Sequence, residues 1–292
     1  MDTTSKTKLA IMAAIAVVIG LVMAYIIPFM VQTSLERVLI HLQAHIAEGF
    51  PAFSSGLKLF DFFFSAWRAL IFVAGAALIT IAWEVKKGRN WTFPAAITFF
   101  AVPAIGGFFM FLPYVSWVPG FPLPMIISFI GLVGFWSFIA LRDVPKMERL
   151  AQLGAFTFIG MMITHAFTIG VGAQRTMATR PGWPLYPGFT WWLFRWAGEV
   201  NWVAAFVLFI SIPLLAMKKK SGWWLAVASV VAILMINVPT QFFRTKTLDY
   251  LYGSLLALGV LFFIIPPYFR QHLLALDAET AGAEGDRVYD AT

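Results

Sequence analysis

Long apolar stretches alternate with short polar segments along the whole chain. Eight of these stretches are long enough to cross a bilayer, because a hydrocarbon core about 30 Å thick needs roughly 20 residues of helix. Backbone polar groups in lipid must pair within their own segment, so each stretch is predicted to be an α-helix. The predicted spans are residues 8–32, 61–85, 91–113, 123–141, 150–173, 196–217, 222–240 and 250–269. The sequence therefore predicts an all-α integral membrane protein with eight transmembrane helices.

The polar connections differ in charge from one side of these spans to the other. Short lysine- and arginine-rich segments fall at 86–89, 142–149 and 218–220, and basic residues also precede the first span and follow the last. All of them lie on one side of an eight-helix arrangement. Because cytoplasmic loops carry an excess of Lys and Arg, this pattern predicts a multi-pass protein of the inner (plasma) membrane with both termini in the cytoplasm.

Weak internal similarity divides the chain into two halves. Residues 8–10 (Lys-Leu-Ala) correspond to 149–151 (Arg-Leu-Ala), and Lys86-Lys87 before Trp91 corresponds to Lys218-Lys219 before Trp223. We therefore expect two four-helix units, residues 1–149 and 150–270, in a parallel pseudo-repeat about a two-fold axis along the membrane normal. Residues 271–292 turn polar and acidic and are expected to form a cytoplasmic tail.

Two long segments on the outer side carry patterns of their own. Residues 34–48 have apolar side chains at Leu35, Val38, Leu39, Leu42 and Ile46, the spacing of one helix face. This predicts an amphipathic helix lying in the outer interface. Residues 174–195 are rich in proline and tryptophan, which predicts a rigid cap at headgroup depth.

Composition agrees with a membrane protein and removes several chemistries. Only 12% of residues are charged and 60% are hydrophobic, whereas soluble domains carry about 25% charged residues. The absence of cysteine excludes disulfides, thiolate metal sites and cysteine nucleophiles. The net charge of +7 follows from the basic inner loops, so we expect no nucleic-acid partner. The expected partners are the lipid bilayer and other subunits of a membrane complex.

The best metal-ligating pattern lies on the amphipathic segment. His41, His45 and Glu48 are spaced by four and three residues, which places them on one helix face. His and carboxylate ligands suit a divalent metal, with Glu36, Asp61 or Glu199 as a further ligand. The same spacing is also typical of the wet face of an interfacial helix, so the two interpretations stay open.

Another candidate site lies closer to the centre of the bilayer. His165 is the only histidine within a predicted span, and an intramembrane ionisable residue indicates function by default. It could donate to a quinone oxygen or simply be satisfied between helices. Arg68, Arg195 and Glu199 stand at the outer ends of spans and are candidates for binding a cofactor headgroup or for sealing the bundle.

Pro103, Gly106, Gly107 and Pro213 interrupt two predicted spans, as in the broken helices that line transporter sites. Acidic residues near the midplane, usual in ion-coupled transporters, are absent from the spans.

Sequence motifs assign no reaction to the chain. It has no Walker A loop, no H-E-x-x-H and no G-x-S-x-G. Haem A synthase and NrfD-like quinol-binding subunits also pair two four-helix bundles. The four membrane histidines of the former are not matched, and no motif of the latter is found. We therefore carry three hypotheses: a subunit of an electron-transport complex that binds a quinol or another lipophilic cofactor, a metal-dependent membrane enzyme, and a carrier for a neutral or lipophilic solute.

Overall fold

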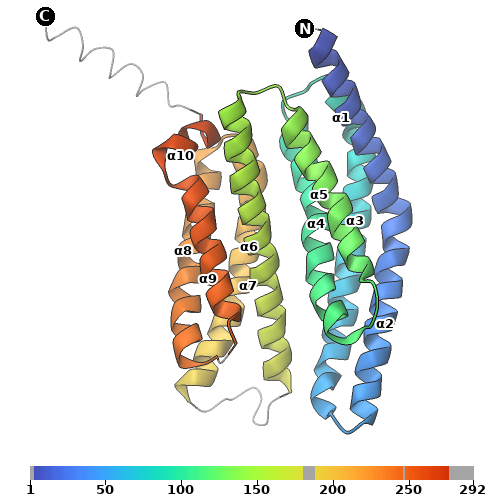
Figure 1. Cartoon of the computed structure of the whole chain (residues 1–292), viewed down its shortest axis with the longest axis vertical. Helices are drawn as coiled ribbons and strands as arrows, with labels where there is room; N and C mark the ends of the chain where they lie inside the picture. The colour runs from blue at the N-terminus through green and yellow to red at the C-terminus, as the bar shows by residue number, and fades with distance from the viewer. Residues whose placement is uncertain (1–2, 180–187, 246, 276–292) are drawn as a thin grey trace, which may run out of the picture.

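The computed structural model describes residues 3–179, 188–245 and 247–275, and every regular element in them is helical (Figure 1). The elements are α1 (Thr3–Leu21), η1 (Val22–Ile26), α2 (Ile27–Ala47), η2 (Pro51–Phe53), α3 (Ser54–Lys86), α4 (Thr92–Trp117), α5 (Leu123–Leu141), α6 (Lys146–Ala178), α7 (Phe189–Ala216), α8 (Lys220–Phe243), α9 (Asp249–Ile264) and α10 (Pro267–Leu273). The prediction of an all-α protein is confirmed.

Seven of the helices in the described residues are long and apolar enough to cross a membrane. An eighth span results if α9 and α10, which meet at an angle of 75°, are taken together. The bend falls at Pro266 and Pro267, where two consecutive residues lack the N–H that would continue the helix. The last predicted span, 250–269, is therefore bent rather than straight. α10 ends at Leu273, so it includes the first residues of the segment 271–292 that was expected to be a polar tail. Residues 276–292 of that tail lie outside the described residues.

The first span and the amphipathic segment form one continuous helix. α1, the π-helical turn η1 and α2 run without a break, and Thr4–Ala47 spans 44 residues. Such a helix is about 66 Å long, roughly twice the thickness of the hydrocarbon core. The prediction of a separate interfacial helix at 34–48 was wrong. Residues 29–48 contain no Gly or Pro to end the helix, and its apolar face, with Leu35, Val38 and Leu42, is buried against α3.

Two groups of helices stand side by side in Figure 1, α1–α5 and α6–α10. In the first group α1 contacts α3, α3 contacts α4, α4 contacts α5, and α5 returns to α1. The second group closes the same ring through α6, α7, α8 and α9. The linker between the groups is 142–145, close to the boundary predicted at 149.

The two bundles do not meet as a two-fold axis requires. α4 contacts both α6 and α7, and a two-fold axis would place α8, its counterpart, against α1 and α3 in the same way. Within the described residues α8 has no comparable contact with either helix. The predicted pseudo-two-fold arrangement is therefore not seen, although the two rings of helices are alike.

Close packing explains the glycines that were expected to break helices. α4 is continuous from Thr92 to Trp117 in spite of Pro103 and Pro113, and α7 continues through Pro213. A Cβ added to Gly107 would lie 2.7 Å from the Cα of Ser128 and 2.8 Å from the carbonyl oxygen of Pro124, both on α5. Small residues let two membrane helices approach closely. Gly107 is thus a packing position at the α4–α5 crossing.

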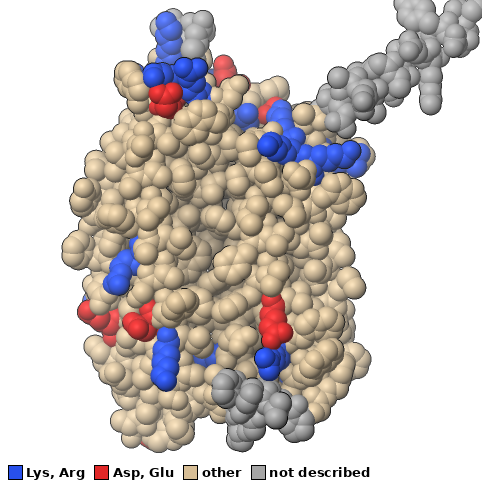
Figure 2. All heavy atoms as spheres, turned by 180° about the vertical axis from the view of Figure 1, so that it is seen from behind, with Lys and Arg blue, Asp and Glu red and all other residues tan. Residues whose placement is uncertain are grey.

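The end of the molecule that holds the basic loops, called here the basic end, is tied together by a buried carboxylate. Glu148 on α6 is 7% exposed and accepts from Lys218 Nζ at 2.8 Å and Arg142 Nη1 at 3.3 Å. Burial lowers the pKa of the Arg142 guanidinium, and the charge of Glu148 partly opposes that shift. These bonds join the α5–α6 linker to the α7–α8 turn. Figure 2 shows that charged residues gather toward the basic end and the opposite, distal end, with an uncharged belt between them.

Candidate functional site

A largely apolar cleft of about 410 Å³ lies in the seam between the two bundles. α4 and α5 form one wall, α6 forms the other, and single residues of α7 and α9 close the back. Phe108, Leu112 and Met161 line the cleft and are also 40–48% exposed. The inter-bundle cleft therefore opens on the side of the molecule, within the uncharged belt where lipid chains would lie.

Small residues create the space of the cleft. Ala101 and Ala104 on α4 face Gly160 on α6. A Cβ added to Gly160 would meet nothing within 4 Å, unlike the tightly packed Gly107. The α6 residues that line the cleft recur at 156, 157, 160, 161, 164 and 165, which is the spacing of one helix face.

Polar groups stand at two points of this apolar wall. His165 and Thr164 lie toward the distal end, and Thr164 Oγ1 donates to the carbonyl of Gly160 at 3.0 Å. Toward the basic end, Trp136 Nε1 donates to Thr157 Oγ1 at 3.1 Å. His165 and Thr157 are separated by about 12 Å along α6, so one ring-sized molecule can contact only one of the two points.

His165 also lies near a pair of buried asparagines inside the second bundle. Its Nδ1 is buried and has no hydrogen-bond partner among the described residues. A Cβ on Gly253 of α9 would lie 3.1 Å from this nitrogen and 2.7 Å from Nδ2 of Asn237 on α8. The missing side chain of Gly253 thus lets the imidazole and the amide approach the same point.

The Asn237 amide is oriented from its other side. Asn201 Nδ2 on α7 donates to Asn237 Oδ1 at 2.7 Å and to the carbonyl of Ala197 at 2.8 Å. Both asparagines are 0% exposed. The Asn237 oxygen is thus held by Asn201, whereas its Nδ2 has no hydrogen-bond partner among the described residues. Side chains from α6, α7 and α8 therefore converge next to the backbone of α9.

The other predicted cofactor-binding residues lie elsewhere. Arg68 donates to Gln32, whose amide donates to Glu36 at 2.7 Å, so Arg68 ties α3 to α2. Arg195 and Glu199 form an exposed ion pair at 2.9 Å on α7. None of the three residues lines the inter-bundle cleft, and they do not form a common site with His165.

The predicted metal ligands are only partly brought together. His45 Nδ1 lies 3.1 Å from Glu48 Oε2, and its ring stacks on Phe53 with centroids 5.2 Å apart. His41 lies one turn earlier on α2. The described part of the chain contains no group of three or more His, Asp and Glu side chains that could hold a metal ion.

The cleft itself was missed in the sequence. Thr157, Gly160 and Thr164 recur at helical spacing in an otherwise apolar span, and this stripe of small and polar residues could have indicated the open face of α6. The contribution of α5, through Trp136, could not be seen, because it depends on how the bundles meet. The Pro/Trp-rich cap could not be evaluated as a whole, since 180–187 lie outside the described residues.

Comparison with family models, with curated proteins and with solved structures found no match for this chain. The functional argument therefore rests on the cleft. Its shape and lining can accommodate a lipophilic molecule that enters from the bilayer and makes a hydrogen bond at His165.

Proposed function

We propose that this protein is a subunit of a larger membrane complex, in an electron-transport chain, and holds a quinone or a similar lipophilic molecule in the inter-bundle cleft. The observation that carries the proposal is His165, the single histidine in the lining of a largely apolar cleft that opens to the lipid belt. Pockets for such ligands are mostly apolar with a few polar groups that fix orientation. His165 fills that role here.

A donor role for His165 requires a neutral ring that carries its proton on Nε2. We assign this tautomer because it leaves Nδ1 as an acceptor toward the Asn237 amide; neither Nδ1 nor Asn237 Nδ2 has a hydrogen-bond partner among the described residues. A ring in this tautomer can donate from Nε2 to a carbonyl oxygen of the ligand. The Asn237–Asn201 pair is then a positioning device, which acts on the ligand only through His165.

Gly160 provides the sharpest test, because a side chain placed there projects into open space. We expect Gly160→Phe to fill the cleft and abolish binding of a short-chain benzoquinone, measured by native mass spectrometry of the purified protein. Gly160→Ala is the matched control and should bind like the wild type. His165→Leu should weaken binding about fivefold to tenfold, the effect of one lost hydrogen bond.

Binding of the quinone by Gly160→Phe with wild-type affinity would contradict the proposal. If His165→Leu binds the quinone with unchanged affinity while Gly160→Phe does not bind it, the cleft remains the proposed binding site and the role of the histidine is rejected. The membership of a complex is tested separately, by mild detergent extraction from native membranes. A chain that purifies alone would count against it.

The proposal also covers the orientation of the protein in the membrane and the origin of its two bundles. The basic end faces the cytoplasm, as the positive-inside rule indicates, and the two similar rings of four helices descend from one duplicated unit. Because the chain has no cysteine, the single substitutions Lys219→Cys and Thr247→Cys can each be treated in intact cells with a membrane-impermeant maleimide, which labels only the outer side. Labelling at Thr247 and protection at Lys219 are expected. The reverse pattern would invert the topology.

A further inference from the structure

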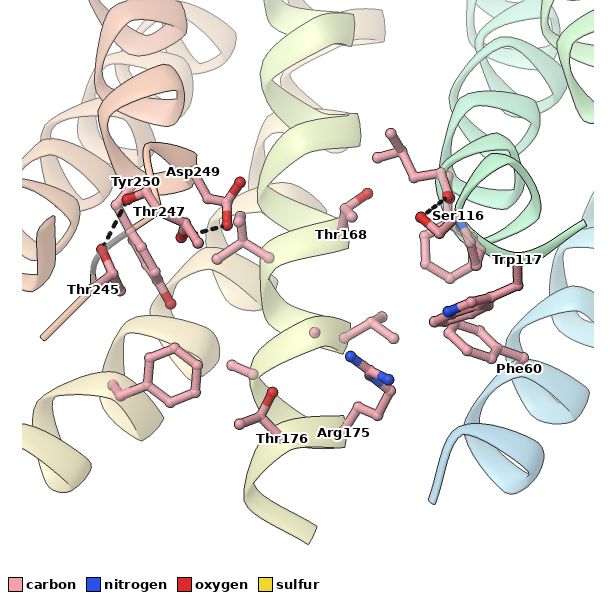
Figure 3. A pocket seen from close by; sticks show the side chains of 18 residues that line it. Phe60, Ser116, Trp117, Thr168, Arg175, Thr176, Thr245, Thr247, Asp249 and Tyr250 are labelled. Carbon is pink, nitrogen blue, oxygen red and sulfur yellow. Dashed lines mark hydrogen bonds between the residues drawn. The ribbon is translucent and has the colours of Figure 1, made fainter. Parts of the chain in front are cut away.

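A second cavity, here called the distal chamber, opens between the bundles at the distal end and has a volume of about 470 Å³. Figure 3 shows its walls, which come from α3 and α4 on one side and from α6, α7 and the start of α9 on the other. Leu112 lines both the distal chamber and the inter-bundle cleft. The two cavities therefore follow one another along the α4–α6 seam.

The depth of the distal chamber matches the headgroup layer of a bilayer. α6 carries no charged residue between Arg149, at the basic end, and Arg175 in the chamber wall. These two arginines are separated by about 39 Å of helix, close to the roughly 40–45 Å of a bilayer with its headgroups. Trp117 and Tyr250, residue types that favour this depth, also line the chamber.

Arg175 brings a positive charge without a counterion into the chamber. Its guanidinium lies over the Trp117 ring, 5.5 Å from the centroid, and the side chain is only partly exposed. Among the described residues it forms no ion pair. A partly desolvated guanidinium favours a phosphate or carboxylate partner, which it can bind through two parallel N–H groups.

Asp249 supplies the opposite charge. Figure 3 shows both residues on the second-bundle wall of the distal chamber, Asp249 at the start of α9 and Arg175 on α6 on the side nearer to Trp117. Oδ2 of Asp249 accepts from Thr247 Oγ1 at 2.8 Å, which leaves its second oxygen available. Tyr250 is 3% exposed, and its hydroxyl has no hydrogen-bond partner in the described part of the chain. A cation, an anion and an unpaired hydroxyl therefore share one chamber.

We infer that the distal chamber binds a zwitterionic phospholipid headgroup with a phosphate and a primary ammonium, as in phosphatidylethanolamine. The phosphate pairs with Arg175, and the ammonium donates to Asp249. An anionic headgroup would satisfy Arg175 but be repelled by Asp249. A choline headgroup has no N–H to donate. The headgroup depth favours a lipid over a soluble zwitterion. The inference does not rest on a ligand in the cleft, although Asp249 of the chamber also acts on His165.

Lipid competition tests the inference. Purified full-length protein is exposed to equimolar phosphatidylethanolamine, phosphatidylcholine and phosphatidylglycerol with identical chains, and retained lipid is measured by native mass spectrometry. The wild type should retain the ethanolamine lipid preferentially. Arg175→Gln should reduce that retention about tenfold, the effect of losing a charged hydrogen-bond partner. Asp249→Asn should retain ethanolamine and glycerol lipids alike. Arg195→Gln, an exposed arginine at the same end, is the matched control and should behave like the wild type.

Several outcomes would overturn the inference. They are equal retention of the three lipids by the wild type, and unchanged retention in Arg175→Gln. Binding of free phosphoethanolamine without retention of lipid would also reject the lipid and make a soluble zwitterion the ligand. If Arg175→Gln does not fold, Arg175→Lys replaces it, because it keeps the charge and loses the forked donors. Its expected result is weaker retention with the same order of lipids.

Discussion

The α4–α5 crossing permits a quantitative test of the idea that Gly107 is a packing position rather than a hinge. In Gly107→Ala the new Cβ would lie 2.7 Å from the Cα of Ser128 and closer still to the Ser128 backbone nitrogen, where 3.4 Å is the lower limit of ordinary contact. The helices must therefore separate by at least 0.7 Å, the difference between these two distances. The bond from Ser128 Oγ to the Ala104 carbonyl, now 2.7 Å long, would weaken with them.

The expected loss of stability follows from three contributions. Overpacking of a core costs about 1–3 kcal/mol, and a weakened interhelical hydrogen bond costs about 0.6 kcal/mol. Replacing Gly by Ala inside a helix returns about 1 kcal/mol. Gly107→Ala should therefore lower the free energy of unfolding by about 0.6–2.6 kcal/mol.

The matched control is Gly160→Ala, whose Cβ meets nothing within 4 Å. It should gain stability from helix propensity alone, by up to about 1 kcal/mol. Reversible unfolding by SDS in mixed micelles, followed by circular dichroism, measures both variants. If Gly107→Ala is as stable as Gly160→Ala, the two helices are not in the close contact described here, and a flexible α4 becomes the better explanation.

Other contacts lead to further predictions, measured in the same SDS titration. Glu148→Ala leaves both cationic partners of Glu148, Lys218 and Arg142, without their carboxylate. Because the two cations are about one-third exposed, we expect the free energy of unfolding to fall by about 2 kcal/mol, less than for a fully buried pair. Glu84→Ala removes a carboxylate at the same end whose side chain is 31% exposed, against 9% for the side chain of Glu148, and should leave the midpoint closer to that of the wild type. Equal effects would contradict the role of burial. Asn237→Leu removes the acceptor of a buried amide and should cost about 0.6–1.7 kcal/mol; a more stable variant would show that the network is not formed. Trp223→Phe deletes the 2.7 Å hydrogen bond from Nε1 to the Ile264 carbonyl, just before the α9–α10 bend. Amide hydrogen exchange of α10 should therefore accelerate. Unchanged exchange would show that the bend does not depend on this hydrogen bond.

Much of the architecture could be predicted from the sequence, because the bilayer restricts the choices. A long apolar run in lipid has to be a helix, and charged residues have to lie toward the ends. The helical character of the spans and the basic loops at one end therefore followed from local patterns. Proline was a weaker guide. Pro266-Pro267 does bend the chain, whereas the helices continue through Pro103 and Pro213, because neighbouring helices determine whether a kink is tolerated.

The tertiary structure decided how the helices meet, and with it the candidate site. The periodicity of 34–48 describes an apolar face, but only the presence of α3 shows that this face is buried against protein rather than lipid. His165 was identifiable as an unusual residue, whereas its surroundings come from α4, α5, α8 and α9, far away in the sequence. The same holds for Arg175 and Asp249, which are 74 residues apart and share a chamber because α9 packs beside α6 in the second bundle. Hydrophobic pattern depends on nearest neighbours along one helix, so it predicts the spans. A cleft depends on shape complementarity between helices, which no local pattern contains.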